Sequence, residues 1–269
     1  MRGDGTSRYR APSTTRTKAP ACIGLLLIVG FGLAGCDRGS ETVLPAPPAG
    51  EALSYVALGD SYPAGGGPVS GESFVDHYED LIEQNSGIEV EVTDLAVNGA
   101  TTEDLLAAIS SPQQRAGLTG AQVITITIGG NDFLQTARTC TEPACFEGVL
   151  VEIEDRLNVI AARVRDAAPD ALILMTNYPD VMAGSAAALA FLGFGSAEVA
   201  RDISMRSNEM ICAVADRHGM RCVDVYGAFN GADGEASARD KGLLANDIIH
   251  PSEEGHRLIA QLLCDIACS

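Results

Sequence analysis

Short apolar segments alternate with longer amphipathic ones along most of this 269-residue chain. The segments VITITI and ALILM carry apolar or β-branched side chains on both faces, as strands do when helices cover both sides of a sheet. The alternation extends over roughly 215 residues, which predicts one α/β domain built on a parallel sheet. Five strands are predicted: Tyr55–Leu58, Glu89–Leu95, Val123–Ile128, Ala171–Asn177 and Arg221–Val225.

Helical periodicity fills the segments between these strands. Within residues 147–166 apolar side chains recur every three or four positions, and Pro169 ends the pattern. Ser252 is placed to cap the last helix. Ligands of such folds bind beyond the carboxyl ends of the strands, so functional residues are expected in the loops that follow them. Helices are predicted over residues 73–84, 103–109, 147–166, 197–218 and 253–266.

Residues 1–35 have the composition of an export signal. Five basic side chains precede an eleven-residue apolar run, Ile23–Leu33, which is shorter than the ~20 residues that a membrane-spanning helix needs. The run ends in Leu-Ala-Gly-Cys36, which resembles the bacterial lipobox, a motif whose cysteine is acylated and becomes the mature N-terminus. An ordinary signal peptide and a retained transmembrane anchor are the alternatives.

Acidic side chains outnumber basic ones by 36 to 18. Removal of residues 1–35 leaves 35 acidic and 13 basic side chains, a net charge of −22. Such a chain offers no basic patch for nucleic acid and is repelled by anionic lipid, so membrane attachment would depend on acyl chains at Cys36. The prolines of residues 36–52 predict an extended tether, and the folded domain is expected over residues 53–269.

Four loops contain residues suited to chemistry. They are Gly-Asp-Ser61-Tyr after the first strand, Asn-Gly99-Ala after the second, Gly-Gly-Asn131-Asp after the third, and Asp247-Ile-Ile-His250-Pro before the last helix. Each alone is compatible with a simple turn. Together they place a nucleophile, a base, an acid and oxyanion donors at one edge of the sheet.

These residue types fit serine-based catalysis. A serine hydroxyl is a poor nucleophile until a base takes its proton, and histidine can do so because its charge changes near neutral pH. Asp247 lies three residues before His250, from where its carboxylate can reach Nδ1 of the imidazole and fix the tautomer. Ser61 is therefore the candidate nucleophile, His250 the base and Asp247 the orienting acid. Asp60 adjoins the nucleophile and is poorly placed to reach the far side of the base.

The four loops, in this order, resemble the sequence blocks of the SGNH (GDSL) hydrolases, a family of serine esterases and lipases. The resemblance covers roughly residues 54–266, and the GxSxG motif of ordinary α/β-hydrolases does not occur in the chain. It implies a three-layer α/β/α, flavodoxin-like fold. It also implies an oxyanion hole made by the backbone N–H groups of Ser61 and Gly99 and the amide of Asn131. Glycine suits position 99 because no Cβ obstructs the approach of the backbone to the substrate.

The cysteines follow the predicted export. Cys22 is removed with the leader and Cys36 takes the lipid, which leaves six cysteines and fifteen possible pairings. A zinc cluster is one alternative, but the chain contains no CxxC. The short spacings favour three sequential disulfides, which an exported location permits: Cys140–Cys145, Cys212–Cys222 and Cys264–Cys268.

Two other features bear on the site. The uncharged, apolar segment Val181–Gly195 is interpreted either as a buried helix or as an acyl-binding wall or lid beside Ser61. The remaining histidines, His77, His218 and His256, are expected to be structural or solvated rather than catalytic or metal-binding.

The sequence therefore predicts an exported, lipid-anchored serine esterase or lipase that hydrolyses small-molecule or lipid esters as a monomer. No metal ion or organic cofactor is implied, and no nucleic-acid partner is expected. A carbohydrate O-deacetylase on the same fold is the alternative activity. A catalytically silent surface binding protein on the same fold is the alternative from another class.

Overall fold

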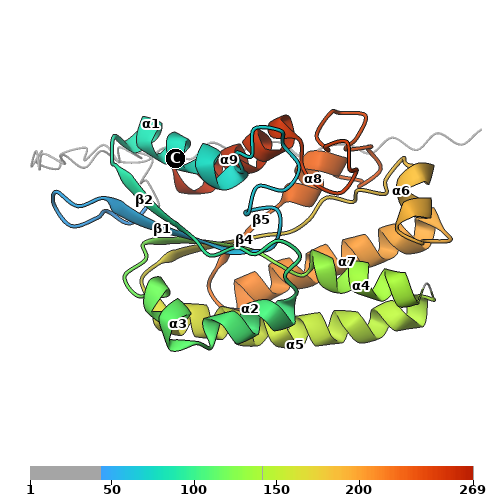
Figure 1. Ribbon diagram of the computed structural model, residues 1–269, viewed down its shortest axis with the longest axis horizontal. Helices are drawn as coiled ribbons and strands as arrows, with labels where there is room; N and C mark the ends of the chain where they lie inside the picture. The colour runs from blue at the N-terminus through green and yellow to red at the C-terminus, as the bar shows by residue number, and fades with distance from the viewer. Residues whose placement is uncertain (1–43, 141, 269) are drawn as a thin grey trace, which may run out of the picture. The chain divides into compact units, whose positions relative to one another are not determined.

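The computed structural model describes residues 44–140 and 142–268, which fold around one parallel sheet (Figure 1). The strands lie in the order β2-β1-β3-β4-β5, which is the flavodoxin-like order. The predicted α/β fold class is thereby confirmed. The strands are β1 Leu53–Gly59, β2 Val90–Asp94, β3 Val123–Thr127, β4 Leu172–Thr176 and β5 Arg221–Val223.

The pairing of β1 with β3 determines where a ligand can bind. These neighbours are in register from Tyr55 opposite Val123 to Gly59 opposite Thr127, so both strands end at the same level. The chain order reverses between them, since β2 lies on the other side of β1. Ligands of open α/β sheets bind at this point of reversal, beyond the carboxyl ends of the strands.

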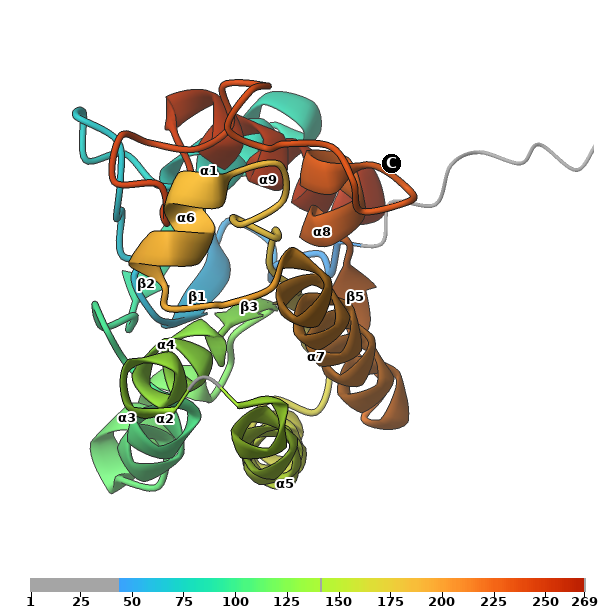
Figure 2. The same cartoon turned by 90° about the vertical axis from the view of Figure 1, so that its right-hand side faces the viewer.

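Helices cover both faces of the sheet and give three layers (Figure 1). One face carries α1, α8 and α9, and the opposite face carries α2, α3, α4, α5 and α7, while α6 lies at the end of the molecule near the start of α7 (Figure 2). Their bounds are α1 Phe74–Ser86, α2 Thr102–Ile109, α3 Pro112–Leu118, α4 Gly130–Thr139, α5 Pro143–Ala167, α6 Ala186–Phe191, α7 Ala197–Arg217, α8 Val225–Asn230 and α9 Glu253–Ala267.

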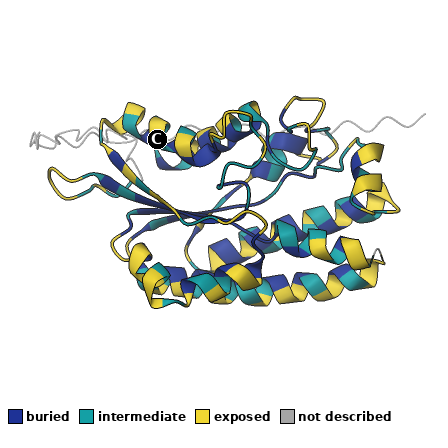
Figure 3. Ribbon diagram, in the orientation of Figure 1, coloured by how far each residue is buried: buried dark blue, intermediate teal, exposed yellow. Residues whose placement is uncertain are grey.

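The core has two large apolar clusters, one on each side of the sheet, and a small third cluster of Ala137, Phe146 and Ile203. Successive residues of β1 alternate between them: Tyr55 packs with the α1–α9 layer, and Val56 packs with the α5 layer. All five residues of β3 are buried (Figure 3), as the apolar pattern on both faces predicts. This burial fixes the carboxyl ends of the central strands, from which the functional loops emerge.

Caps determine where several helices begin. Ser73 and Asp76 form a reciprocal capping box at the start of α1. The Ser252 hydroxyl accepts the N–H of Gly255 at the start of α9, which confirms the predicted cap. The loop that carries His250 is thus joined directly to a helix with a defined first turn.

Some predicted boundaries were wrong, and three short helices were missed. The predicted fifth strand ends at Val223 rather than Val225, because the Asp224 carboxylate accepts the N–H of Gly227 and starts α8. The Gly-Gly-Asn-Asp segment begins α4 instead of forming a turn. The unpredicted helices are α3, α4 and α8, whereas α6 lies within the segment Val181–Gly195 that the sequence analysis allowed to be helical.

The structure joins the three cysteine pairs that the sequence favours. Cys140 at the end of α4 is bonded to Cys145 in α5, Cys212 of α7 to Cys222 of β5, and Cys264 to Cys268 at the end of α9. No helix in the described ranges is both long and apolar enough to cross a membrane. The leader, residues 1–35, and Cys36 lie outside the described residues.

Candidate functional site

Three polar side chains form a chain of hydrogen bonds at the carboxyl edge of the sheet. Ser61 follows β1 by two residues, and His250 lies in the loop before α9. The Nε2 atom of His250 lies 2.8 Å from the Ser61 hydroxyl, and its Nδ1 atom lies 2.7 Å from the Asp247 carboxylate. The structure therefore brings together Ser61, His250 and Asp247, although 189 residues separate the serine from the histidine.

The loop before His250 holds Asp247 in place. One carboxylate oxygen accepts the backbone N–H groups of Ile249 and His250 at 3.1 and 3.0 Å, and the other faces the imidazole. Ile248 adopts the left-handed φ of 64°, which turns the chain back over the carboxylate. Partial burial raises the pKa of Asp247, but the hydrogen bonds outweigh it and lower the pKa overall, so the carboxylate stays charged near neutral pH.

The other two predicted oxyanion residues line the same cavity as Ser61. Asn131 lies in the first turn of α4, and its amide donates to the carbonyl of Ala100 at 2.9 Å, which holds it beside Gly99. The amide carries a second hydrogen for another acceptor. Gly99 has φ 79°, while a Cβ there would contact nothing within 4 Å. The left-handed backbone favours glycine at this position, in addition to the close approach of a substrate that the sequence predicts.

Asp132 fixes the two oxyanion loops relative to each other. Its buried carboxylate accepts the backbone N–H and the hydroxyl of Thr102 at 2.9 and 2.6 Å, at the start of α2. Arg156 of α5 approaches the same carboxylate at 3.4 Å. Burial raises the pKa of Asp132, and the bonds from Thr102 and Arg156 oppose that rise. The helix that carries Asn131 is thus tied to the helix that follows Gly99.

Asp60 lies next to the nucleophile but does not orient the base. Its carboxylate accepts the N–H of Tyr62 at 3.0 Å and the hydroxyl of Tyr178 at 2.6 Å. Burial raises the pKa of Asp60 to about 6, against the lowering effect of these two hydrogen bonds. The Tyr62 hydroxyl donates to the carbonyl of Ile249 at 2.9 Å, so the nucleophile's turn also supports the His250 loop.

Two of the other histidines have structural partners. His256 is fully buried; its Nδ1 accepts the N–H of Phe74 at 3.0 Å, and its Nε2 faces the carbonyl of Gly66 at 3.1 Å. Burial lowers the pKa of His256 to about 4, so the ring is neutral and Nε2 donates. His218 pairs with Asn158 across α7 and α5.

An apolar cavity of about 340 Å³ opens beside Ser61. Residues of α4, α7 and the segment Val181–Gly195 line it. That segment is not a buried helix: α6 covers only part of it, and Phe191 is 68% exposed. It forms one wall of the cavity. The apolar lining residues include Phe133, Leu134, Val181, Met182, Leu192, Phe194, Ile203 and Ile211.

Sequence reasoning missed Tyr178, which lies two residues beyond β4 and contacts Asp60. It also missed the roles of Asp132 and Tyr62 in support of the site. Tyr178 belongs to no recognised block. The signal that could have found it is its position, because it directly follows a strand whose carboxyl end lies at the same edge as Ser61.

A flavodoxin-like sheet whose edge carries a hydrogen-bonded serine, histidine and aspartate beside an apolar cavity is typical of ester hydrolases. Comparison with known proteins agrees with this class. Residues 57–258 match the model of the GDSL-like lipase/acylhydrolase family, and the chain belongs to this family. It is an ester hydrolase of the GDSL/SGNH type.

Individual relatives resemble most of the chain. It is 28% identical to Lipase 2 of Streptomyces coelicolor over 254 residues, which cover 80% of this chain and 85% of the relative. Phospholipase A1 of Streptomyces albidoflavus is 26% identical, with a TM-score of 0.60 over 81% of this chain and 100% of that structure. A lipase from a goat rumen metagenome is similar in fold, with 24% identity and a TM-score of 0.68 over 81% of this chain and 98% of that structure.

Proposed function

We propose that this protein hydrolyses carboxylic esters of apolar acyl groups through a covalent acyl-enzyme on Ser61. The observation that carries the proposal is the Ser61–His250–Asp247 chain of hydrogen bonds at the mouth of the apolar cavity. The His250 Nε2 accepts the Ser61 proton as Oγ attacks the ester carbonyl carbon. The ionised Asp247 then stabilises the imidazolium that forms.

The remaining steps use the same groups. Negative charge on the carbonyl oxygen of the tetrahedral intermediate is met by the N–H groups of Ser61 and Gly99 and by the second amide hydrogen of Asn131. The intermediate collapses to an acyl-serine when His250 returns its proton to the leaving alkoxide. Water, deprotonated by His250, attacks the acyl-serine, and the acid leaves as Ser61 recovers its proton.

The cavity favours an acyl group larger than acetyl. Each buried methylene contributes about 0.8 kcal/mol, and an acetyl group would leave most of an apolar cavity of about 340 Å³ empty. Relatives carry the names lipase and phospholipase A1, which supports a lipid ester as the substrate here. An O-deacetylase would need polar contacts for a sugar, and this lining is mostly apolar.

Turnover of p-nitrophenyl esters of increasing acyl length tests the proposal. We expect kcat/KM to rise with each methylene by at most about fourfold, which corresponds to 0.8 kcal/mol, until the cavity is filled. Ser61→Ala should abolish the activity. Fastest turnover of the acetyl ester would contradict the proposal and favour the deacetylase.

A pair of variants on α7 tests whether the acyl chain occupies this cavity. Ser204 lines the cavity, so Ser204→Phe should lower kcat/KM for long esters while the acetyl ester is hydrolysed as before. Met205, the next residue, is 38% exposed and does not line the cavity. Met205→Phe is therefore the matched control. Its kcat/KM should depend on the acyl length of the ester in the same way as that of the wild type. Identical profiles for all three proteins would place the acyl chain elsewhere.

We further propose that the enzyme is exported and anchored by an acylated Cys36. The basic segment, the apolar run and the Leu-Ala-Gly-Cys36 sequence support this location. Three disulfide-bonded pairs support the export, because structural disulfides persist mainly in oxidising compartments.

A further inference from the structure

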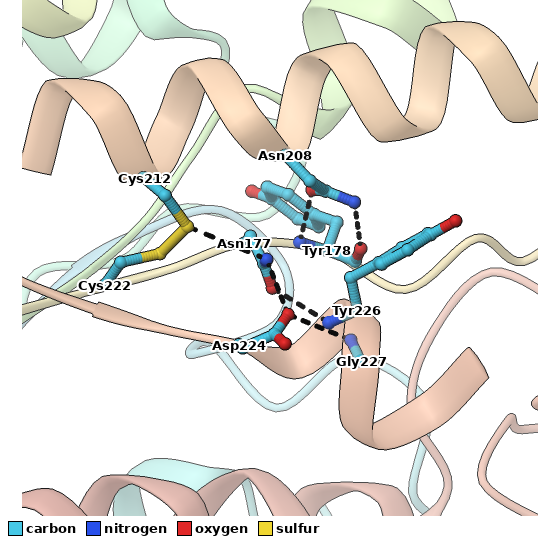
Figure 4. The surroundings of a disulfide bond; sticks show 8 residues. All are labelled: Asn177, Tyr178, Asn208, Cys212, Cys222, Asp224, Tyr226 and Gly227. Carbon is cyan, nitrogen blue, oxygen red and sulfur yellow. Dashed lines mark hydrogen bonds between the residues drawn. A yellow bond between two sulfur atoms is a disulfide. The ribbon is translucent and has the colours of Figure 1, made fainter. Parts of the chain in front are cut away.

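Tyr178 is held at the carboxyl end of β4 by a clamp from α7. The side-chain oxygen of Asn208 accepts the Tyr178 N–H at 3.0 Å, and its amide donates to the Tyr178 carbonyl at 2.8 Å (Figure 4). Four residues further along α7, the Cys212–Cys222 disulfide ties this helix to β5. The backbone N–H and C=O of Tyr178 are therefore both held by α7, which the disulfide ties to the sheet.

The side chain of Tyr178 contacts both halves of the candidate catalytic site. Its hydroxyl donates to Asp60 at 2.6 Å, and the other oxygen of Asp60 accepts the N–H of Tyr62, so the hydrogen bonds enclose Ser61. Its ring lies against Gly130, where a Cβ would come within 3.2 Å of the ring. Gly130 is the first residue of α4 and precedes Asn131.

We propose that Tyr178 is a positioning residue that sets the nucleophile's turn and the start of the oxyanion helix relative to each other, acting through its hydrogen bond to Asp60. This inference rests on the proposed hydrolysis at Ser61. The Tyr178 ring also lines the cavity, so the proposed role belongs to its hydroxyl, whose partner Asp60 adjoins Ser61.

The charge of Asp60 gives the contact a dependence on pH. The groups that face Asp60 are Tyr178, Tyr62, His250 and Asp132. A charged Asp60 accepts from Tyr178 and Tyr62 at once and interacts favourably with a protonated His250, the form that acylation produces. A protonated Asp60 must itself donate a hydrogen, so it can no longer accept both hydrogen bonds in the same way and loses the attraction to a protonated His250. Activity should therefore need the carboxylate form.

The test is Tyr178→Phe, which removes the hydroxyl and keeps the ring. Because this variant loses a hydrogen bond to a charged group, kcat should fall by about tenfold or more, whereas KM should change little. Loss of the donor should also move the acidic limb of kcat/KM upward by about one pH unit. Tyr78→Phe is the matched control, because the buried Tyr78 hydroxyl has no hydrogen-bond partner in the described part of the chain. It should leave kcat, KM and the pH profile unchanged.

A double-mutant cycle gives a second readout. Asn208→Ala releases the backbone of Tyr178, so its loss of kcat should overlap with that of Tyr178→Phe instead of multiplying with it. An unchanged kcat and pH profile in folded Tyr178→Phe, or fully multiplicative losses in the double variant, would overturn the positioning role. Ser61→Ala separates the two proposals. Hydrolysis that persists in Ser61→Ala would refute the proposed mechanism, whereas its loss there beside wild-type behaviour of Tyr178→Phe refutes only the positioning role.

Discussion

At the scale of single residues, the buried charge of Asp60 lowers the free energy of unfolding at neutral pH. An acid whose pKa is higher in the folded protein than in the unfolded chain binds protons more readily when folded, so acidification favours folding. The pKa of Asp60 is raised from 3.8 to about 6, chiefly by burial. Above pH 6 the folded protein therefore keeps Asp60, beside the nucleophile, as a carboxylate, although the neutral acid would make the fold more stable.

Asp60→Asn should make the protein more stable and less active. The amide keeps an oxygen for the Tyr62 N–H and carries no charge to desolvate. At pH 7 we expect the free energy of unfolding to rise by up to about 3 kcal/mol, while kcat falls. The stability difference should shrink as the pH falls through 6 and vanish below about 4. Urea unfolding at several pH values measures it, and a variant less stable than the wild type at pH 7 would contradict the argument.

Asn131→Ala tests the oxyanion hole. The nucleophile and base remain, but one donor to the developing negative charge is lost, which typically costs about 2.7–4 kcal/mol, or 100–1,000-fold in kcat. KM should change little, because the interaction strengthens in the transition state. Steady-state kinetics on a short p-nitrophenyl ester provide the measurement. A folded variant with near-wild-type kcat would mean that Asn131 only holds the Ala100 carbonyl.

The residues Ser61, Asn131, Asp247 and His250 could be predicted from the sequence because their chemistry requires particular residue types at loop positions. The contacts that support them could not be predicted in this way. The bond from Tyr178 to Asp60 joins residues 118 positions apart. Nothing local to Tyr178 distinguishes it from any tyrosine that follows a strand.

At the scale of elements, long periodic segments were predictable and short helices were not. Strand β3 and helix α5 carry their burial pattern in their own sequence, because each packs along its whole length. Helices α4 and α8 have 10 and 6 residues and depend on tertiary contacts. Two glycines open α4, and their turn-forming tendency conceals a helix that Asp132 and Thr102 hold in place.

The disulfides should differ in what they stabilise. Loop-closure entropy predicts about 2 kcal/mol for each pair separated by 4 or 5 residues and nearer 3 kcal/mol for Cys212–Cys222, which closes 10. Replacement of both cysteines by alanine in each pair, followed by chemical unfolding, measures these values. Only the Cys212–Cys222 replacement should also lower kcat, because α7 carries the Asn208 clamp on Tyr178. An equal loss of kcat on removal of Cys264–Cys268 would argue against this link.

At the scale of the whole molecule, net charge and the proposed anchor act against each other. The proposed cleavage before Cys36 would leave a chain with a net charge of −22, which anionic head groups would repel. In the proposed lipoprotein the acyl chains at Cys36 would have to act against this repulsion. Leu44 packs against the core cluster of α1 and α9, so at most residues 36–43 would separate the anchor from the folded domain, about 30 Å if fully extended.

Cys36→Ser should accordingly move the expressed protein from the detergent phase to the aqueous phase, or leave it unprocessed. The matched control is Cys22→Ser, since Cys22 lies within the predicted leader and outside Leu-Ala-Gly-Cys36. This control should partition like the wild type, because one cysteine is lost but the acylated position is kept. Detergent phase separation and the mass of the mature N-terminus provide the two measurements. A wild type whose mature chain still includes residues 1–35 would indicate a retained transmembrane anchor. A wild type found wholly in the aqueous phase would indicate an ordinary signal peptide, and in either case the anchor at Cys36 would be refuted.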